Sequence, residues 1–136
     1  MLHRIKKKND MHEGKWNGLG GKIENGETPE ACAIREIKEE SGLDVSDPQF
    51  KGFITFPNFD GDNDWYVFLF CFENYEGELI DSDEGHLEWI DPVRMDQIPL
   101  WEGDRIFMKW LDKAGLFSAV FKYDSGRLLD WNVTWY

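Results

Sequence analysis

The 136-residue chain carries 27 acidic and 15 basic residues, which gives a formal net charge of −12. A surface of that sign repels a polyphosphate backbone and so argues against long nucleic acid as a partner. It does not exclude a small phosphorylated ligand, because a bound divalent cation reverses the local field. The content of 41% apolar and 15% aromatic residues indicates a packed globular domain spanning residues 1–136 rather than a disordered chain.

The cysteines and the apolar runs give expectations about the compartment. Cys32 and Cys71 form neither a CxxC pair nor a metal-ligand spacing with histidine, and both lie in apolar runs. We interpret them as small core residues of a protein from a reducing compartment. The longest apolar stretch, residues 67–72, is too short to span a bilayer, and no signal peptide is visible. We therefore expect a cytoplasmic protein with no membrane partner.

The first quarter of the chain predicts a strand and a glycine-rich loop. Residues 1–5 read as a strand, and residues 6–10 read as a basic turn. Residues 14–22 then contain four glycines in nine positions. Glycines permit positive φ and a close approach of the backbone to a ligand, so this loop is a candidate binding segment.

The clearest predicted helix runs from Thr28 to Ser41. Thr28 is a favourable N-cap, and Pro29 fits the first helical position. Gly42 follows where a C-terminal glycine ends a helix. This segment therefore has both a start and a stop signal.

The rest of the chain is predicted to be mainly β with one more helix. Strands are expected at residues 49–56, 65–72 and 86–90, with a turn-rich connection at residues 58–63. A second helix is expected from Trp101 or Glu102 to Lys113, with Gly115 as its stop, because apolar residues recur there at helical spacing. A hairpin of residues 116–123 and 127–136 is expected to end the chain. This order of elements predicts an α+β fold or a layered α/β/α domain.

Three carboxylates mark the first helix as a metal-binding element. Glu36, Glu39 and Glu40 are related by i,i+3 and i,i+4 spacings and therefore share one face. Their mutual repulsion costs stability unless a cation compensates, and Mg²⁺ prefers such oxygen ligands. Arg35 lies beside this face and can orient a glutamate by a charge-assisted hydrogen bond.

The loop before the helix adds a candidate phosphate site. Gly20 and Gly21 bring the backbone close to the predicted metal, and Lys22 adds a cation. A phosphate bound there meets metal, lysine and backbone amides together, which stabilises the charge that develops in phosphoryl or nucleotidyl substitution.

Together, loop and helix resemble the box of the Nudix family, GX5EX7REUXEEXGU, in which U is a bulky aliphatic residue. Every fixed position matches: Gly21, Glu27, Arg35, Glu36, Ile37, Glu39, Glu40, Gly42 and Leu43. By average residue usage, the seven fixed polar and glycine positions coincide by chance on the order of once in 10⁹ starts. Further segments look like the MutT-type enzymes and the animal oxidised-purine nucleoside triphosphatases, namely residues 14–22, 82–84, 96–99, 101–104 and 128–131.

The resemblance implies a Nudix fold, an α/β/α sandwich around a mixed sheet, and a set of site residues. Mg²⁺, for which Mn²⁺ can substitute, would be held by the carboxylates of Glu36, Glu39, Glu40 and Glu84 and the backbone carbonyl of Gly21. The catalytic set would be Arg35, Glu36, Glu39 and Glu84, with Glu36 either a ligand or the base that activates water. The family is not uniform on which glutamate is the base.

The same resemblance implies ligand contacts outside the box. Arg4 and Lys22 would bind phosphates, and Asn17, Trp101 and Asp104 match positions that recognise the base in purine-specific members. Each has a plainer alternative. Arg4 could be solvated and Glu84 a surface residue. Asn17 could cap a turn, Trp101 could be core, and Asp104 could favour the first turn of its helix.

One departure from the family concerns the N-terminus. Relatives usually have another strand before the segment that corresponds to residues 2–4. Without that strand, unpaired sheet edges would favour association with a second chain as a homodimer. We therefore expect a Nudix fold that lacks the usual first strand.

These observations favour Mg²⁺-dependent hydrolysis of nucleoside triphosphates to nucleoside monophosphate and pyrophosphate, with oxidised purine nucleotides such as 8-oxo-dGTP as candidate substrates. One alternative is hydrolysis of another nucleoside diphosphate derivative, such as ADP-ribose, a nucleotide sugar or a dinucleoside polyphosphate. Another is a non-catalytic nucleotide-binding module. The complete carboxylate set argues for an enzyme.

Overall fold

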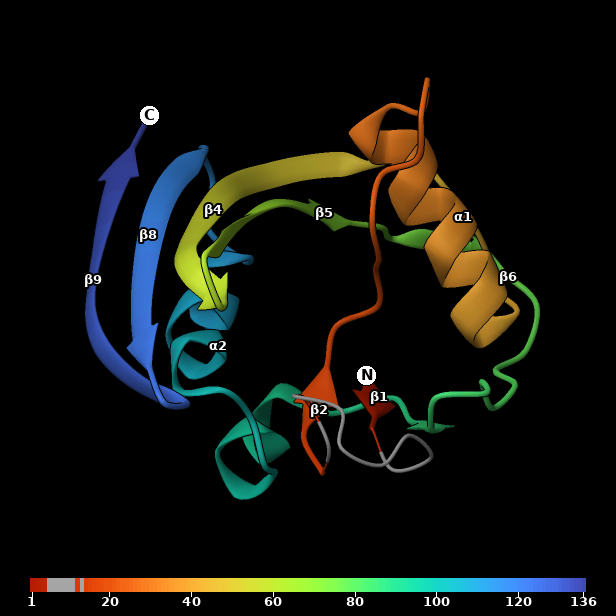
Figure 1. Cartoon of the computed structure of the whole chain (residues 1–136). Helices are drawn as coiled ribbons and strands as arrows, with labels where there is room; N and C mark the ends of the chain where they lie inside the picture. Colours follow the sequence, from red (N-terminus) through yellow and green to blue (C-terminus); the bar gives the residue numbers. More distant parts are fainter. Residues whose placement is uncertain (5–11, 13) are drawn as a thin grey trace. The chain divides into compact units, whose positions relative to one another are not determined.

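The computed structural model describes residues 1–4, 12 and 14–136 (Figure 1). The expected basic turn at residues 6–10 lies outside the described residues. The chain divides into two compact units, Met1–Pro48 with Phe72–Leu100, and Gln49–Cys71 with Trp101–Tyr136. No helix within the described ranges is long and apolar enough to cross a membrane.

The first unit contains the predicted helix, α1 (Pro29–Ser41). The Thr28 hydroxyl accepts a hydrogen bond from the Ala31 amide at 3.1 Å. Gly42 takes a left-handed conformation, with φ of 79°, and its amide donates to the Lys38 carbonyl. The start and stop signals of the sequence therefore act as predicted.

The remaining elements of the first unit are short. They are β1 (Leu2–His3), β2 (Trp16–Asn17), β3 (Asp44–Ser46), β6 (Asn74–Glu76), β7 (His86–Leu87) and a 3₁₀ helix, η1 (Pro92–Gln97). Strand β1 pairs with β2 and β7, and β3 pairs with β6, all antiparallel. The strand expected at residues 86–90 is thus only two residues long. Strands β2, β3 and β6 are too short for a sequence pattern to reveal them.

The second unit is a four-stranded mixed sheet in the order β5-β4-β8-β9. Its strands are β4 (Gln49–Asp60), β5 (Asn63–Cys71), β8 (Phe117–Asp124) and β9 (Arg127–Trp135). The pair β4–β8 is parallel, whereas β4–β5 and β8–β9 are antiparallel hairpins. The mixed sheet together with a few helices confirms the predicted α+β class.

The second helix is shorter than expected. It comprises α2 (Glu102–Phe107) and a 3₁₀ turn, η2 (Met108–Trp110), rather than one helix to Lys113. The amides of Leu111 and Lys113 bond three residues back, to Met108 and Trp110. In the same segment, Phe107 and Trp110 pack with Ile54, Phe117 and Phe121 of the sheet. Tertiary packing of these rings outweighs the weak helical preference of the last turns.

The connection between β4 and β5 also differs from the prediction. Residues 58–63 were expected to form a turn, but the strands extend to Asp60 and from Asn63. Asn58 has a positive φ of 49°, and the pairing register shifts between Phe56 and Asp60. The irregular pairing accommodates Asn58 within β4. From the sequence alone, a turn-favouring residue inside a strand cannot be distinguished from the start of a loop.

Candidate active site

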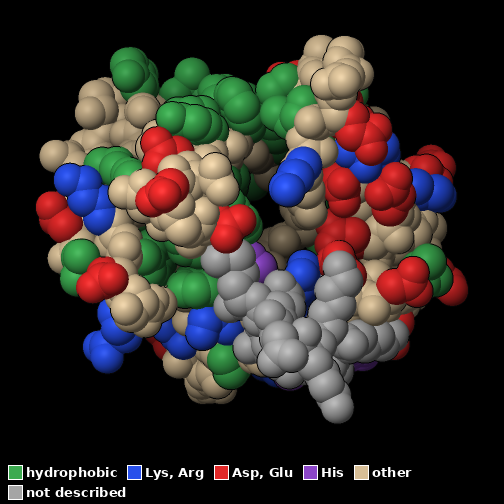
Figure 2. Space-filling model, in the orientation of Figure 1, with side chains coloured by type: hydrophobic (Ala, Val, Ile, Leu, Met, Phe, Trp, Pro, Cys, Tyr) green, Lys and Arg blue, Asp and Glu red, His purple; other side chains and the backbone are tan. Residues whose placement is uncertain are grey.

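Arg35 on α1 connects three carboxylates, of which Glu36 and Glu39 belong to the predicted site. Its Nε and Nη2 donate to the two oxygens of Glu27 at 2.7 and 3.0 Å. Its Nη1 donates to Glu36 Oε1 at 2.8 Å and lies 3.3 Å from Glu39 Oε2. Figure 2 shows acidic side chains gathered over α1, with basic side chains among them. The arginine therefore orients glutamates of α1 by charge-assisted hydrogen bonds, as the sequence suggested for one glutamate.

Glu27 is the site residue whose role the sequence reasoning missed. It matches the box, yet only the structure shows that it is the principal partner of Arg35. The hydrogen bonds from Arg35 and the amide of Glu24 lower the pKa of Glu27 to about 2. Its fixed place in the box, eight residues before an arginine, was the available signal.

Gly21 lets the loop approach α1 more closely than any other residue would. A Cβ at this position would meet the Glu36 carboxyl carbon at 2.4 Å. The Gly21 carbonyl also accepts a hydrogen bond from Cys32 Sγ at 3.6 Å. Cys32 is a buried free thiol, as the sequence predicted. Its hydrogen bond to Gly21 shows that it lies against this loop and not in a purely apolar core.

Glu40 is the buried carboxylate of the set. Its Oε1 accepts a hydrogen bond from the Gly20 amide at 2.9 Å, and only 7% of the residue is exposed. Burial raises the pKa of Glu40 to about 7, and the charges of Glu84 and Glu36 raise it further, against the Gly20 hydrogen bond. The carboxylates of Glu84, on the later loop, and of Glu36, on α1, thus both act on the carboxyl group of Glu40.

Glu84 and Arg4 form an ion pair, with Nη1 and Oε2 2.9 Å apart. From the sequence, Glu84 is expected to bind metal and Arg4 to bind phosphate. The Glu84 amide donates to the Ser82 hydroxyl at 3.1 Å, which fixes the loop that carries the carboxylate. The exposed Lys22 lies at the same site, where its backbone carbonyl accepts from Arg35 Nη2 at 3.1 Å.

The carboxylates are not arranged as a closed metal site. Among the residues that the structure describes, no three His, Cys, Asp or Glu side chains lie close enough together to hold an ion. The oxygens of Glu36, Glu40 and Glu84 are instead hydrogen-bonded by Arg35, the Gly20 amide and Arg4. The chemistry of the donor set nevertheless fits a hard divalent cation, because all donors are oxygens and their charges oppose one another at Glu40.

The three residues predicted to recognise a base fall in different units. Asn17 belongs to the first unit, whereas Trp101 and Asp104 belong to the second, at the start of α2. The side-chain oxygen of Asn17 is buried and has no hydrogen-bond partner within the described part of the chain. Trp101 and Asp104 are both buried, and the Asp104 amide donates to the Trp101 carbonyl at 3.0 Å.

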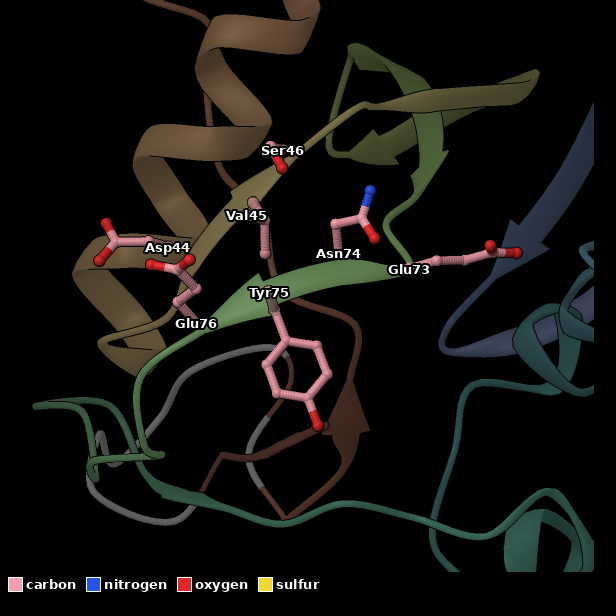
Figure 3. A pocket seen from close by; sticks show the side chains of 7 residues that line it. All are labelled: Asp44, Val45, Ser46, Glu73, Asn74, Tyr75 and Glu76. Atoms are coloured by element: carbon pink, nitrogen blue, oxygen red, sulfur yellow. The ribbon is translucent and has the colours of Figure 1, made fainter.

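A separate pocket of about 620 Å³ lies along β3 and β6 of the first unit. It is lined by Asp44, Val45, Ser46, Glu73, Asn74, Tyr75 and Glu76 (Figure 3). In Figure 3, Asn74 and Tyr75 point to opposite sides of β6. Its lining contains three carboxylates and no basic residue, so it disfavours an anionic nucleotide. The candidate active site is therefore the set of carboxylates around α1 and not this pocket.

Comparison with known proteins shows the family to which the chain is similar. The family model of the NUDIX domain matches residues 1–111. The oxidized purine nucleoside triphosphate hydrolase of Danio rerio is 40% identical over 121 residues, which are 86% of this chain and 75% of that protein. The uncharacterized Nudix hydrolase YvcI of Bacillus subtilis is 36% identical over 81% of this chain and 73% of its own. The crystal structure of the mutator MutT protein of Bacillus halodurans aligns with a TM-score of 0.83 and 31% identity, covering 97% of this chain and 86% of that one.

Proposed function

Because the chain belongs to the NUDIX domain family, we propose that it is a pyrophosphohydrolase that cleaves nucleoside triphosphates to nucleoside monophosphate and pyrophosphate. Its preferred substrates are oxidised purine nucleotides such as 8-oxo-dGTP. The match to the family runs through both compact units, which supports a single catalytic domain over residues 1–136.

The observation that carries this proposal is the position of four glutamates relative to two arginines. Arg35 holds Glu36 and Glu39, Arg4 holds Glu84, and the charges of Glu36 and Glu84 both act on the buried Glu40. Mutual repulsion of carboxylates lowers the stability of the fold unless a bound cation offsets it. A site that gathers them on and beside one helix is suited to a cation that in turn holds phosphate.

Enzymes of this family act with a divalent metal ion, and the metal proposed here is magnesium, for which manganese can substitute. Glu39, Glu40 and Glu84 would hold it together with the Gly21 carbonyl, and Glu36 would be a further ligand or the base. When bound, the ion supplies charge stabilisation for the phosphates. Water attacks a phosphorus of the triphosphate, the bond to the bridging oxygen breaks, and a glutamate of the box takes the proton.

The remaining cations and polar groups are assigned to the substrate. Lys22 and Arg4 would bind the phosphate oxygens, Arg4 after exchange of its contact with Glu84. The buried oxygen of Asn17 needs a donor, and an N–H group on a purine edge supplies one. The relatives from Danio rerio and Mus musculus are named as hydrolases of oxidized purine nucleoside triphosphates, which supports this choice of base.

Two further parts of the proposal concern the setting of the enzyme. The two free thiols suit the reducing environment of the cytoplasm. Strands β2 and β7 form the two edges of the sheet β2-β1-β7, and an unpaired sheet edge favours pairing with a second chain, so a homodimer is proposed.

A substrate panel tests the proposed function. Canonical and oxidised nucleoside triphosphates, ADP-ribose and diadenosine polyphosphates are each incubated with Mg²⁺ or with EDTA, and ³¹P NMR identifies the products. The expected result is Mg²⁺-dependent release of pyrophosphate, fastest with an oxidised purine triphosphate. Release of orthophosphate from dGTP, or turnover of ADP-ribose alone, would contradict the proposal.

Substitutions test the assignment of the carboxylates. Glu39→Gln and Glu40→Gln are expected to lose turnover with Mg²⁺. Glu30→Gln is the matched control, because Glu30 lies exposed in the first turn of the same helix. Full turnover by either of the first two variants would show that the metal assignment is wrong.

A further inference from the structure

The first turn of α2 takes its cap from a distant strand. Trp101 occupies the N-cap position, and within the described residues no side-chain hydrogen bond from it caps the helix. An indole has a donor but no acceptor, so it cannot serve the free amides of a first turn. The Tyr123 hydroxyl at the end of β8 accepts a hydrogen bond from the Gly103 amide at 2.7 Å instead.

Gly103 makes this contact possible. A Cβ at this position would lie 2.6 Å from the Tyr123 hydroxyl and 2.9 Å from Phe121 Cδ1. Any residue with a side chain would push the phenol away from the helix. The pair of a glycine at position 103 and a tyrosine at position 123 is therefore a matched set.

Tyr123 also contacts the ring of Trp101. The two ring centroids lie 5.4 Å apart at an interplanar angle of 83°, an edge-to-face arrangement. Phe59 contacts both rings in the same way, at 5.1 Å from Trp101 and 5.4 Å from Tyr123. One phenol thus fixes the backbone of the first turn through its oxygen and the indole through its ring.

The hydroxyl keeps its proton under ordinary conditions. Burial raises the pKa of Tyr123 to about 12, and the carboxylates of Asp104 and Glu102 raise it as well, against the hydrogen bond from Gly103. The group therefore acts near neutral pH as a neutral hydrogen-bonding partner and adds no charge beside Asp104.

We propose that Tyr123 is a positioning residue for base recognition, whose hydroxyl holds the first turn of α2 so that Trp101 and Asp104 keep the placement that a purine base requires. This inference rests on the proposed function. The placement of the two base-contacting residues then depends on a side chain of β8, outside the helix that carries them.

Tyr123→Phe tests the role, because it keeps the ring and removes only the oxygen. KM and kcat are measured for dGTP, 8-oxo-dGTP and dCTP at saturating Mg²⁺. Loss of one hydrogen bond corresponds to about a three- to tenfold change in an equilibrium constant. We expect KM for the purine triphosphates to rise by about that factor while kcat is kept, so that the preference over dCTP falls equally.

Tyr66→Phe is the matched control, since Tyr66 lies exposed on β5 and its hydroxyl donates to Asp64 Oδ2 at 3.4 Å, its one hydrogen-bond partner among the residues that the structure describes. It should leave both constants unchanged. A structural role alone would lower the active fraction of Tyr123→Phe and so reduce kcat for purines and pyrimidines in the same proportion. That result, or an unchanged purine preference, would overturn the inference.

Amide hydrogen exchange gives a readout that does not need activity. The Gly103 amide is expected to exchange faster in Tyr123→Phe, and unchanged exchange would overturn the inference. If Tyr123→Phe does not fold, Gly103→Ala displaces the same hydroxyl and should show the same split between KM and kcat. Failure of the proposed function is distinguishable, because the wild-type protein would then release no pyrophosphate from any triphosphate, whatever the exchange at Gly103.

Discussion

The Arg35 guanidinium holds the Glu27 carboxylate through two hydrogen bonds, from Nε at 2.7 Å and from Nη2 at 3.0 Å. Its remaining nitrogen, Nη1, is thereby directed to Glu36 at 2.8 Å. Glu27 thus anchors the arginine, and the arginine orients a glutamate of the predicted metal set. The position of the Arg35 guanidinium, and with it that of the Glu36 carboxylate, therefore depends on Glu27 in the loop before α1.

Arg35→Lys should therefore impair catalysis although it keeps the charge. An ammonium group cannot reproduce the planar fork that bonds Glu27 and Glu36 at the same time. We expect kcat to fall by about 10- to 100-fold, which corresponds to the loss of about 1–3 kcal/mol of oriented hydrogen bonding. Steady-state kinetics with dGTP and Mg²⁺ measure it. Arg127→Lys, at an 81% exposed arginine paired with Glu102, should leave kcat within a factor of two, about 0.4 kcal/mol.

The contact between Glu27 and Arg35 predicts a stability difference at acid pH. The folded-state pKa of Glu27, about 2, lies below its usual value of 4.5, so the contribution is present above pH 4.5 and is lost as the pH falls towards 2. Glu27→Gln should accordingly be less stable than the wild type at pH 6, and the gap should narrow between pH 4.5 and 2. Urea unfolding across this range measures the gap. A gap that stays constant with pH would show that the carboxylate charge plays no part.

Glu40 predicts the opposite pH dependence. Its folded-state pKa is raised from 4.5 to about 7, so the folded protein binds this proton more tightly and loses stability as the pH rises through that window. Without metal, Glu40→Gln should become more stable than the wild type between pH 5 and 7, by on the order of 1–3 kcal/mol, with no further gain above pH 8. The amide oxygen can still accept from Gly20.

Thermal unfolding in EDTA at pH 5, 7 and 8 measures this effect. Addition of Mg²⁺ should raise the melting temperature of the wild type more than that of Glu40→Gln, because a bound cation offsets the buried charge. An equal shift for both variants would contradict a role of Glu40 in metal binding.

The helix that carries the site was predictable from the sequence because its determinants are local. Thr28 and Gly42 mark its ends through contacts with residues three or four positions away. The same holds for the hairpin of β8 and β9, where Ser125 and Gly126 both take positive φ, as a two-residue hairpin turn requires. Local chemistry in these segments agrees with the final fold.

The contacts within the site were not predictable in the same way. Arg4 and Glu84 are 80 positions apart, and the pairing at 2.9 Å follows from the fold rather than from any spacing. Similarly, Tyr123 caps α2 across 20 positions, and nothing in the sequence near Trp101 indicates it. The family resemblance supplied the candidate residues, whereas the structure supplied their partners.

Gly21 gives the last prediction, since the box requires glycine there and the structure gives the reason. A Cβ at position 21 would lie 2.4 Å from both Cδ and Oε1 of Glu36, so the carboxylate must move. The movement would also break its 2.8 Å hydrogen bond with Arg35. Gly21→Ala should therefore lower kcat by about tenfold or more, because a displacement of about 1 Å at a catalytic group has an effect of this size.

The matched control is Gly18→Ala in the same loop, where a Cβ would meet no atom of the described residues within 4 Å. Kinetics of both variants with dGTP and Mg²⁺, together with their unfolding midpoints, separate displacement of Glu36 from a general effect of alanine on the loop. Alanine restricts the unfolded chain more than glycine, so neither variant should lose much stability through backbone entropy. If Gly21→Ala kept the wild-type kcat, Glu36 would not need the position in which Arg35 and the loop hold it, and its role as metal ligand or base would have to pass to another glutamate.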